Sequence, residues 1–466
     1  MKIDILRIVT AASLFDGHDA AINIMRRILQ SKGVEIIHLG HNRGVQEIVE
    51  CAVEEDAHAI AITSYQGGHV EFFKYMKDLL KEAGCAHIKI FGGGGGTILP
   101  QEIAELQAYG IDRIYSPDDG RKLGLEGMID DVIKQTRSEE SSAVFNRAPE
   151  QWGTTPPLGE TKDIRRIARA ITLAELDEAP LPEMTGNQQH EKVPVLGITG
   201  TGGAGKSSVT DELVRRFLNG YPGKTIAVLS VDPSRKKTGG ALLGDRIRMN
   251  AIAHPRAYMR SMATRDDHVA LSSSIQKAID VCRSAAFDLI ILESAGVGQS
   301  DASIVNYVDA SIYVMTPEYG AASQLEKINM LDYADIICIN KFDKTGSLDA
   351  LMEVRKQYKR NQLLWHTADE ELPVMGTVAA KFNDPGVNEL FLKIIQVLNK
   401  KCGAAFDELV SFQHTAQLER SIIPGKRARY LSEIAESVRQ YNQWADDQAA
   451  VASKLYQLDG VIKMYK

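Results

Sequence analysis

The residues from Gly200 to Ser207, with the sequence GTGGAGKS, have the types and spacing of a phosphate-binding loop. They follow an apolar run and precede a helical pattern, which is the context that this motif requires. Glycines let backbone N–H groups approach phosphates, and the helix N-terminus adds its positive end. Lys206 can reach the β- and γ-phosphates, and the Ser207 hydroxyl can bind Mg²⁺. A glycine-rich turn without a ligand is the alternative. The residues predicted to contact nucleotide are Gly200, Gly202, Gly203, Ala204, Gly205, Lys206, Ser207 and Ser208.

A second apolar run ends in an acid at Glu293 and continues into Ser294, Ala295 and Gly296. This pattern is typical of a strand that leads into a switch loop. Glu293 would hold Mg²⁺ directly or through water, and the Gly296 N–H would sense the γ-phosphate. The alternative is an acid that closes a buried strand.

The segment from Val231 to Arg248 also begins where a strand is expected to end. Asp232 and Asp245 are placed to serve a metal, and Arg246 or Arg248 could neutralise charge on the phosphates. A solvated charged loop is the alternative.

Asn340, Lys341 and Asp343 form an NKxD pattern after an apolar run. The Asp343 carboxylate can accept hydrogen bonds from N1 and N2 of guanine, which adenine cannot supply. Together with the phosphate loop and the acid at Glu293, this order predicts GTP rather than ATP.

A different chemistry is indicated near the N-terminus, where Asp16 and His18 follow the first apolar run. In a base-off cobalamin domain, DxHxxG occupies this loop; the histidine ligates cobalt, and the aspartate holds its other nitrogen. Ala21 replaces the last glycine of that motif. His69 and, more weakly, His41 are alternative ligands. Two further loops, 64–69 and 92–97, are rich in small residues that could admit the nucleotide tail of cobalamin; the candidate contacts there are Ser64, Gly92 and Gly93.

The elements expected to position these loops alternate between strands and helices over residues 3–136. Such alternation implies parallel strands with right-handed crossovers, here in a flavodoxin-like sheet. The expected strands are 3–9, 34–39, 59–63, 88–91 and one near Ile114, with helices around 20–30, 45–53, 70–80 and 102–106.

A second α/β unit is expected over residues 193–400, with strands at 193–198, 226–231, 289–292, 310–314, 336–339 and 374–377. Between the two units, prolines and polar residues indicate a linker that permits relative motion and contains a short helix at 163–176. The last sixty or so residues lack strand patterns. Apolar spacing at Leu431, Ile434 and Val438 predicts a helix there.

The fold class is therefore α/β. The expected domains are a B12-binding domain at 1–137, a linker at 138–190, a P-loop GTPase domain at 191–402 and a helical arm at 403–466.

The composition is that of a globular protein, with 466 residues, 44% hydrophobic and 25% charged. A net charge of −7 argues against a nucleic-acid partner. No run of 18 apolar residues and no signal-peptide pattern is present, so we expect a cytoplasmic protein with no membrane partner. The five scattered cysteines are expected to be reduced and mostly buried.

The segments DPS at 232–234, GGALLGDRIRM at 239–249, ESAGVGQS at 293–300 and NKFD at 340–343 together resemble the GTPase chaperones of adenosylcobalamin-dependent acyl-CoA mutases. This resemblance covers about residues 190–400 and implies two magnesium positions. It implies as ligands Ser207, Asp232, Asp245 and Glu293, with the Val231 carbonyl and Ser294 as additions. It also implies a further switch at 320–327, where Gln324 and Lys327 would act with Lys206 and Arg248 in catalysis once a partner docks; that segment could equally be ordinary surface.

The first unit resembles the B12-binding domains of isobutyryl-CoA and methylmalonyl-CoA mutases, and the domain order resembles the fused isobutyryl-CoA mutases. In that family the histidine loop also lacks the last glycine, which favours His18 as the cobalt ligand. The resemblance implies adenosylcobalamin, GTP and Mg²⁺ as cofactors. The implied partners are an acyl-CoA mutase large subunit or domain of the isobutyryl-CoA/n-butyryl-CoA type, an adenosyltransferase as cofactor donor, and a second copy through the GTPase domain.

A substrate-binding (β/α)₈ barrel needs ~250 residues, and far fewer follow residue 400. We therefore expect GTP hydrolysis to gate cofactor loading here, and mutase chemistry to need a separate subunit or domain. Two alternatives stay open: a cobalamin carrier or sensor with a regulatory GTPase and no mutase role, or a metallochaperone GTPase whose first domain binds something else.

Overall fold

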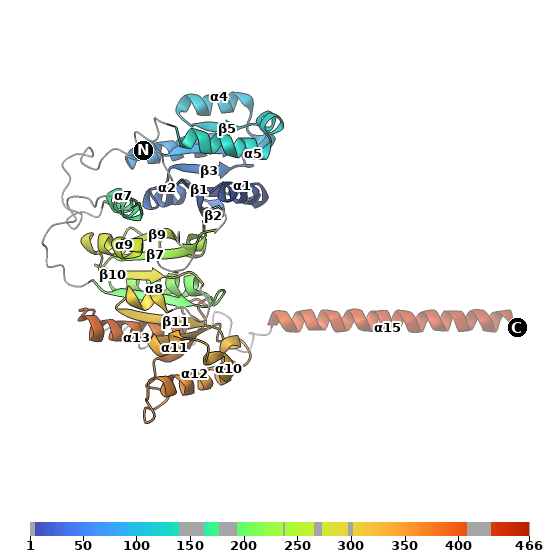
Figure 1. Cartoon of the computed structure of the whole chain (residues 1–466). Helices are drawn as coiled ribbons and strands as arrows, with labels where there is room; N and C mark the ends of the chain where they lie inside the picture. Colours follow the sequence, from blue (N-terminus) through green and yellow to red (C-terminus); the bar gives the residue numbers. More distant parts are fainter. Residues whose placement is uncertain are drawn as a thin grey trace. The chain divides into compact units, whose positions relative to one another are not determined.

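Two parallel β-sheets carry most of the described chain in this computed structural model, which describes residues 5–138, 163–176, 193–235, 238–264, 273–296, 302–407 and 430–465. The chain divides into two units, residues 1–409 and 410–466. Both sheets belong to the first unit, and Figure 1 labels some of the strands of each.

The first sheet has the strand order β5-β4-β3-β1-β2-β8. Its first five strands have the flavodoxin-like order that the alternating pattern predicted. The sixth, β8, is supplied by the second half of the sequence. The strands and helices of this domain are β1 (Arg7–Ser13), α1 (Asp19–Ser31), β2 (Glu35–Arg43), α2 (Val45–Glu54), β3 (Ala59–Thr63), α3 (His69–Glu82), β4 (Lys89–Gly93), α4 (Pro100–Tyr109), β5 (Arg113–Tyr115) and α5 (Pro117–Thr136).

The second sheet has the order β13-β12-β11-β6-β10-β7-β9, and all its pairs are parallel. Its strands are β6 (Val195–Gly200), β7 (Ile226–Pro233), β9 (Ala257–Thr264), β10 (Leu289–Glu293), β11 (Ala310–Met315), β12 (Ile336–Asn340) and β13 (Val374–Thr377). The accompanying helices are α8 (Lys206–Gly220), α9 (Ser273–Ser284), α10 (Ala322–Leu325), α11 (Met330–Tyr333), α12 (Ser347–Asn361) and α13 (Pro385–Cys402).

The expected strands all exist, but their ends differ from the apolar runs. The first strand runs from Arg7 to Ser13 rather than over 3–9, because the chain stays extended through small residues such as Ala11 and Ala12. The prediction missed β8 (Leu242–Leu243) and β9 altogether. In β9 the apolar pattern is broken by Arg260, whose side chain is nevertheless fully buried.

The linker contains α7 (Ile164–Glu175), close to the predicted helix, but α7 is not a free spacer. Ile167 and Ile171 are fully buried in the core of the second sheet. The Glu175 carboxylate bonds Arg7 of β1 at 3.3 Å and Arg260 of β9 at 2.7 Å. This part of the predicted linker is therefore folded into the first unit, because α7 packs against both sheets.

The described part of the C-terminal unit contains α15 (Tyr430–Met464), which confirms the helix predicted from its apolar spacing. No described helix combines the length and apolar character needed to cross a membrane. All five cysteines are free, and only Cys402 is not buried.

Candidate nucleotide and cobalamin sites

The phosphate loop lies where the motif predicted, between the end of β6 and the start of α8. Gly205 caps α8 with a φ of +92°, a left-handed conformation that glycine adopts without strain. A Cβ on Gly205 would lie 2.4 Å from the Asn340 amide nitrogen. Glycine is therefore needed here both for the turn and for the approach of Asn340.

Lys206 is buried at the first position of α8. Its ammonium group donates to the carbonyls of Gly200 at 3.2 Å and Thr201 at 3.5 Å. Burial lowers the pKa of Lys206, while the nearby carboxylates of Glu293, Asp245 and Asp232 act in the opposite direction. The cation thus lies over the loop that would hold phosphates.

Three carboxylates from separate segments gather beside this loop: Asp232, Asp245 and Glu293, called here the acidic cluster. The Ser207 hydroxyl lies 2.9 Å from Glu293 Oε1 and 3.1 Å from Asp245 Oδ1. Thr210 donates to the other Glu293 oxygen at 2.6 Å, and Ser230 donates to the other Asp245 oxygen at 2.8 Å. The single hydroxyl proton of Ser207 can be donated to only one of these two carboxylates. With Lys206 as the nearby buried cation, the three carboxylates are also short of positive charge.

The titration of the acidic cluster reflects that shortage. Burial, together with Asp245 and Glu293, raises the pKa of Asp232 to about 7. Burial and then Asp245 raise the pKa of Glu293 to about 7. Asp232 Oδ2 is buried and accepts no hydrogen bond from the described residues. Orphaned acceptor oxygens are the chemistry that Mg²⁺ prefers.

Within the described ranges, no three His, Cys, Asp or Glu side chains are arranged to hold a metal ion by themselves. A cation in the acidic cluster would therefore need Ser207 and oxygens from the nucleotide as further ligands. The two expected additions, Val231 and Ser294, are less well placed. Val231 lies within the β7–β9 ladder, and the Ser294 hydroxyl donates to Thr199 Oγ1 at 2.8 Å and approaches the Ala295 carbonyl at 3.2 Å.

Sequence reasoning missed Thr210 and Ser230, which orient Glu293 and Asp245. Thr210 stands three residues after Ser207 in α8, so the helical period could have placed it near the same face. Ser230 gave no comparable signal, because only the register of β7 against β10, which pairs Ser230 with Glu293, brings it to the site.

Arg246 does not face the phosphate loop, so its proposed role in neutralising phosphate charge is wrong. Its guanidinium is buried and pairs with Glu54, and it donates to the Met259 carbonyl at 2.8 Å. Arg248, two residues later, is exposed and lies close enough to oppose the charge of Asp232. Of the two arginines, only Arg248 stays a candidate for the nucleotide.

The base-reading motif lies beside the phosphate loop, as predicted. The Asn340 amide donates to the Ala204 carbonyl at 2.8 Å, and the Lys341 ammonium donates to the Gly203 carbonyl at 2.7 Å. Asp343 is exposed, and so is free to meet a base. Asn340 Oδ1 also accepts from the Ala379 N–H at 3.1 Å, so the loop after β13 joins this site without a motif that we recognised.

Among the described residues, the other switch candidates, Gln324 and Lys327, make no hydrogen bond or ion pair with the phosphate loop. Gln324 is half-buried in α10, and Lys327 is exposed just after it. Gly296 is close, since a Cβ on it would lie 2.9 Å from the Gly202 Cα. The rest of its loop, 297–301, lies outside the described residues.

At the other candidate site, a fully buried Asp16 holds His18. Asp16 Oδ1 accepts from the His18 backbone N–H at 2.9 Å and lies 2.8 Å from its ring Nδ1, while Oδ2 accepts from the Tyr65 N–H at 2.7 Å. Burial favours the neutral acid, but these hydrogen bonds hold the pKa of Asp16 below its usual value. The His18 side chain is 71% exposed and directs its bonded nitrogen inward, so Nε2 is available to a ligand.

The two rival histidines differ from His18. Both ring nitrogens of His69 have partners: Nδ1 lies 3.1 Å from the Gln66 carbonyl and Nε2 lies 3.0 Å from Glu102. His69 therefore has a structural role that leaves no nitrogen for cobalt. His41 is exposed near the end of β2 and has no counterpart to Asp16 among its recorded bonds.

A mostly apolar cavity of about 870 Å³, counting its part open to solvent, lies between α1, α5 and the ends of β3 and β4. His18 does not line it, but the His18 ring lies 5.5 Å from the ring of Tyr65, which does. Gly92 and Gly93 line it, as predicted, together with Tyr65. A Cβ on Gly92 would meet Phe73 at 2.4 Å, so this glycine also serves packing. The Ser64 hydroxyl is buried and accepts a hydrogen bond from Ser13 at 2.9 Å.

Comparison with protein families agrees with the two sites. Residues 6–120 match the B12 binding domain, and residues 167–421 match the methylmalonyl-CoA mutase-associated GTPase MeaB. The second match begins within α7, in line with the packing of that helix in the core of the second sheet.

The chain is also similar to longer curated proteins. It is 53% identical over 471 residues to the fused isobutyryl-CoA mutase of Geobacillus kaustophilus, and the matched region covers 99% of this chain and 43% of that relative. It is 52% identical over 458 residues to the fused isobutyryl-CoA mutase of Cupriavidus metallidurans, covering 97% of this chain and 41% of that relative. A putative GTPase of Pyrococcus abyssi is 37% identical over 240 residues, which is 50% of this chain and 71% of that protein. The chain thus spans about two fifths of the fused mutases that it matches.

Proposed function

Because the chain belongs to the family of the methylmalonyl-CoA mutase-associated GTPase MeaB and also carries a B12-binding domain, we propose that it hydrolyses GTP to gate the loading of adenosylcobalamin into an acyl-CoA mutase. The proposed mutase is of the isobutyryl-CoA/n-butyryl-CoA type, after the names of the fused relatives. The acyl-CoA site would be on a large subunit or domain outside the described sheets.

The observation that carries the GTPase proposal is the acidic cluster around Ser207. Three carboxylates lacking positive charge, with a serine hydroxyl between two of them, lie at the N-terminus of α8 beside a buried lysine. Ser207 and the acidic cluster would hold Mg²⁺ together with the nucleotide, and the ion would supply the missing positive charge. Lys206 would then exchange its carbonyl contacts for the β- and γ-phosphates, and Asp343 would select guanine.

The test is GTP turnover by the whole chain, measured alone and with a complementary acyl-CoA mutase large subunit. We expect slow turnover alone and faster turnover on the complex, because Gln324 and Lys327 need a docking surface to reach the nucleotide. Lys206→Ala should lower turnover by ~10²-fold or more. Lys74→Ala, at a half-buried surface lysine of the first domain that pairs with Glu105, is the matched control.

Several outcomes would contradict this function. Equal affinity for ATP and GTP would refute the base-reading role of Asp343. Unchanged turnover on a demonstrated complex would refute gating and leave the cobalamin carrier or sensor with a separate GTPase switch. Acyl-CoA isomerisation by this chain alone would mean that the substrate site lies within it.

For cobalamin, the open nitrogen of His18 near the apolar cavity supports binding with the cofactor's own base displaced into that cavity. The electron paramagnetic resonance spectrum of the cob(II)alamin form should show nitrogen coupling that changes on ¹⁵N-histidine labelling. His18→Ala should remove it, whereas His41→Ala should not. Coupling that survives His18→Ala would assign the cobalt ligand elsewhere.

Two further partners belong to the proposal. An adenosyltransferase would donate the cofactor, and a second copy of the chain would associate through the GTPase domain. Light scattering of the chain with and without guanine nucleotide tests the second, and direct transfer of cofactor from a purified adenosyltransferase tests the first. A monomer under both conditions would remove the homo-oligomer.

A further inference from the structure

The segment 238–249, which carries Asp245 of the acidic cluster, is built into the first domain as much as into the second. Its strand β8 pairs in parallel with Ile36 and Ile37 of β2, and the Ile36 N–H donates to the Ala241 carbonyl at 2.9 Å. Ala241 and Leu243 are fully buried in the core cluster of the first domain. A strand that continues another domain's sheet cannot move without breaking that sheet's hydrogen bonds.

Close contacts continue on both sides of β8. A Cβ on Gly240 would lie 2.1 Å from the Gln30 carbonyl, so the backbones touch there. Past β8, the Ile247 side chain packs where a Cβ on Gly40 would lie 2.6 Å away, and Arg43 approaches the Ile247 carbonyl at 3.4 Å. Residues 238–249 therefore pack against the first domain along most of their length, against Gln30 of α1 at one end and against β2 over the rest.

The short 3₁₀ helix Asp245–Arg248 presents its first two residues to different domains. Successive residues of such a helix point about 120° apart, since it has three residues per turn. Asp245 faces Ser207 and Ser230 of the GTPase site. Arg246 faces the end of α2, where it pairs with Glu54 and lies 3.6 Å from Glu55.

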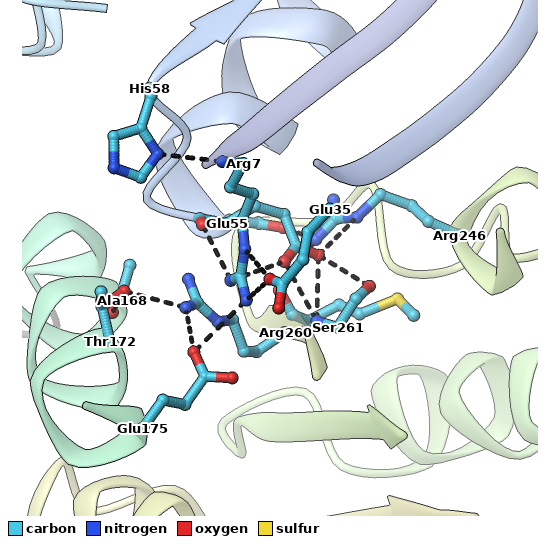
Figure 2. A network of polar contacts seen from close by, with 12 residues as sticks. Arg7, Glu35, Glu55, His58, Ala168, Thr172, Glu175, Arg246, Arg260 and Ser261 are labelled. Atoms are coloured by element: carbon cyan, nitrogen blue, oxygen red, sulfur yellow. Dashed lines mark hydrogen bonds and ion pairs between the residues drawn. The ribbon is translucent and has the colours of Figure 1, made fainter. Parts of the chain in front are cut away.

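Glu55 anchors that contact. It is fully buried, its carboxylate accepts from the Ser261 N–H at 3.1 Å and hydroxyl at 2.9 Å, and it lies 3.7 Å from the Arg7 guanidinium. Figure 2 shows Glu55 between Arg7 of the first domain and Arg246 and Ser261 of the second. Asp245 is thus tied, through its neighbour Arg246, to a carboxylate pair of the cobalamin domain.

The same strand β2 also reaches the cobalt-ligand loop. Asn42, near its end, accepts a hydrogen bond from the Phe15 N–H at 2.8 Å, and Phe15 immediately precedes Asp16. Both Phe15 and Asn42 adopt positive φ angles, 63° and 57°, which non-glycine residues rarely do. The hydrogen bond makes the conformations of Phe15 and Asn42 depend on each other. A shift of β2 would therefore also shift the loop that carries Asp16 and His18.

We infer that the segment 238–249 links occupancy of the two sites, with Arg246 as the positioning residue that ties Asp245 to Glu54 and Glu55. Metal–nucleotide binding at Asp245 and cobalamin binding at His18 both act on β2, one through Arg246 and Ile247 and the other through Phe15 and Asn42. Linkage of this kind is reciprocal, so each ligand must change the affinity of the other by the same factor. The inference rests on the proposed function, since it needs both ligands to bind.

The experiment measures the affinity of the whole chain for Mg²⁺–GDP with and without saturating hydroxocobalamin, and the affinity for hydroxocobalamin with and without Mg²⁺–GDP. We expect the same factor in both directions, of about 5-fold or more. Glu54→Gln should reduce that factor to within about 2-fold and raise the Mg²⁺ concentration needed for half-maximal GDP binding. Arg246→Lys should keep part of the coupling, because it keeps the charge but loses the fork.

Glu50→Gln is the matched control, because Glu50 lies on the same helix, is exposed and accepts a hydrogen bond from Gln46, while its charge acts on Glu54 less than Arg246 and Glu55 do. It should leave the coupling factor unchanged. A second measurement does not depend on the folding of any variant: in the wild-type chain, Mg²⁺–GDP should slow amide hydrogen exchange in β2 as well as in 238–249.

The outcomes separate the two claims. Failure of the chain to bind GDP or cobalamin would defeat the proposed function, and with it this inference. The linkage is refuted, while the proposed function stands, if both ligands bind but neither changes the affinity of the other. It is also refuted if Mg²⁺–GDP does not change the rate of amide hydrogen exchange in β2. Coupling that persists undiminished in Glu54→Gln would place the route elsewhere and overturn the role of Arg246.

Discussion

Among the described residues, two groups of buried or half-buried carboxylates flank the segment 238–249, and they are neutralised in opposite ways. The acidic cluster of Asp232, Asp245 and Glu293 has Lys206 as its nearby buried cation. The interdomain group of Glu35, Glu54, Glu55 and Glu175 meets three buried arginines, Arg7, Arg246 and Arg260. The interdomain carboxylates are paired with arginines of the chain and so stabilise an interface. The acidic cluster lacks such partners in the described part of the chain, so only the acidic cluster can gain stability by binding an added cation.

One carboxylate of the interdomain group, Glu54, is only partly stabilised by its arginine. Burial raises the pKa of Glu54 to about 7, although Arg246 acts to lower it. The same ion pair raises the pKa of Arg246 further above its usual value, against the effect of burial. We therefore regard the arginine as permanently charged and Glu54 as the group that titrates.

Removing an arginine from the interdomain group should have the largest effect on stability. Arg7→Met leaves Glu35, Glu55 and Glu175 without their shared partner, and should cost about 3–5 kcal/mol in the free energy of unfolding. Urea denaturation followed by circular dichroism measures the loss. A loss below ~1 kcal/mol would show that the interface tolerates uncompensated charge.

Removing a carboxylate from the acidic cluster should act in the opposite direction. Glu293→Gln relieves like-charge crowding, so the protein without ligand should become more stable, by about 1–3 kcal/mol at pH 8. The same variant should lose the stabilisation that Mg²⁺–GDP gives the wild type, which thermal unfolding with and without ligand would reveal. If Glu293→Gln destabilises the unliganded chain, the cluster is structural rather than a metal site.

The pH dependence should distinguish the two groups. Asp232, Glu293 and Glu54 have folded-state pKa values raised to about 7, above their values in the unfolded chain. Their contribution to stability is therefore complete below about pH 4 and is lost as the pH rises through 7, by at most about 1.4 kcal/mol per pH unit for each proton released.

Mg²⁺–GDP should remove the part of this loss that comes from Asp232 and Glu293, and Glu54→Gln should remove the rest. Unfolding measured between pH 5 and 8 checks both. Stability of the unliganded chain that rises over this range would contradict the sign.

The smallest effect should come from an ion pair at the surface. Arg121→Met removes a pair with Asp118 in which both side chains are mostly exposed, and should hardly change the free energy of unfolding. Measured beside Arg7→Met, it separates the effect of buried charge from that of losing any arginine. A loss comparable to that of Arg7→Met would remove the distinction.

The sequence alone determined the two folds and most of the nucleotide site. Apolar runs located every strand of the two sheets except β8 and β9. Gly205, Lys206 and Ser207 could be assigned because their spacing is local and their backbone conformation is dictated by glycine. The same holds for Asp16 and His18, where two residues on one loop form the hydrogen bond that the motif predicted.

Only the tertiary structure decided which charges meet. Asp245 and Arg246 are neighbours in one polar segment, yet Asp245 faces Ser207 whereas Arg246 faces Glu54 at the end of helix α2, 192 residues earlier in the chain. Strand β9 was missed because Arg260 interrupts its apolar pattern. Nothing in the sequence shows that Arg260 will be buried in an ion pair with Glu175 of the linker helix. Local spacing fixes what a loop can bind, whereas pairing between distant buried charges depends on the register and packing that bring them together.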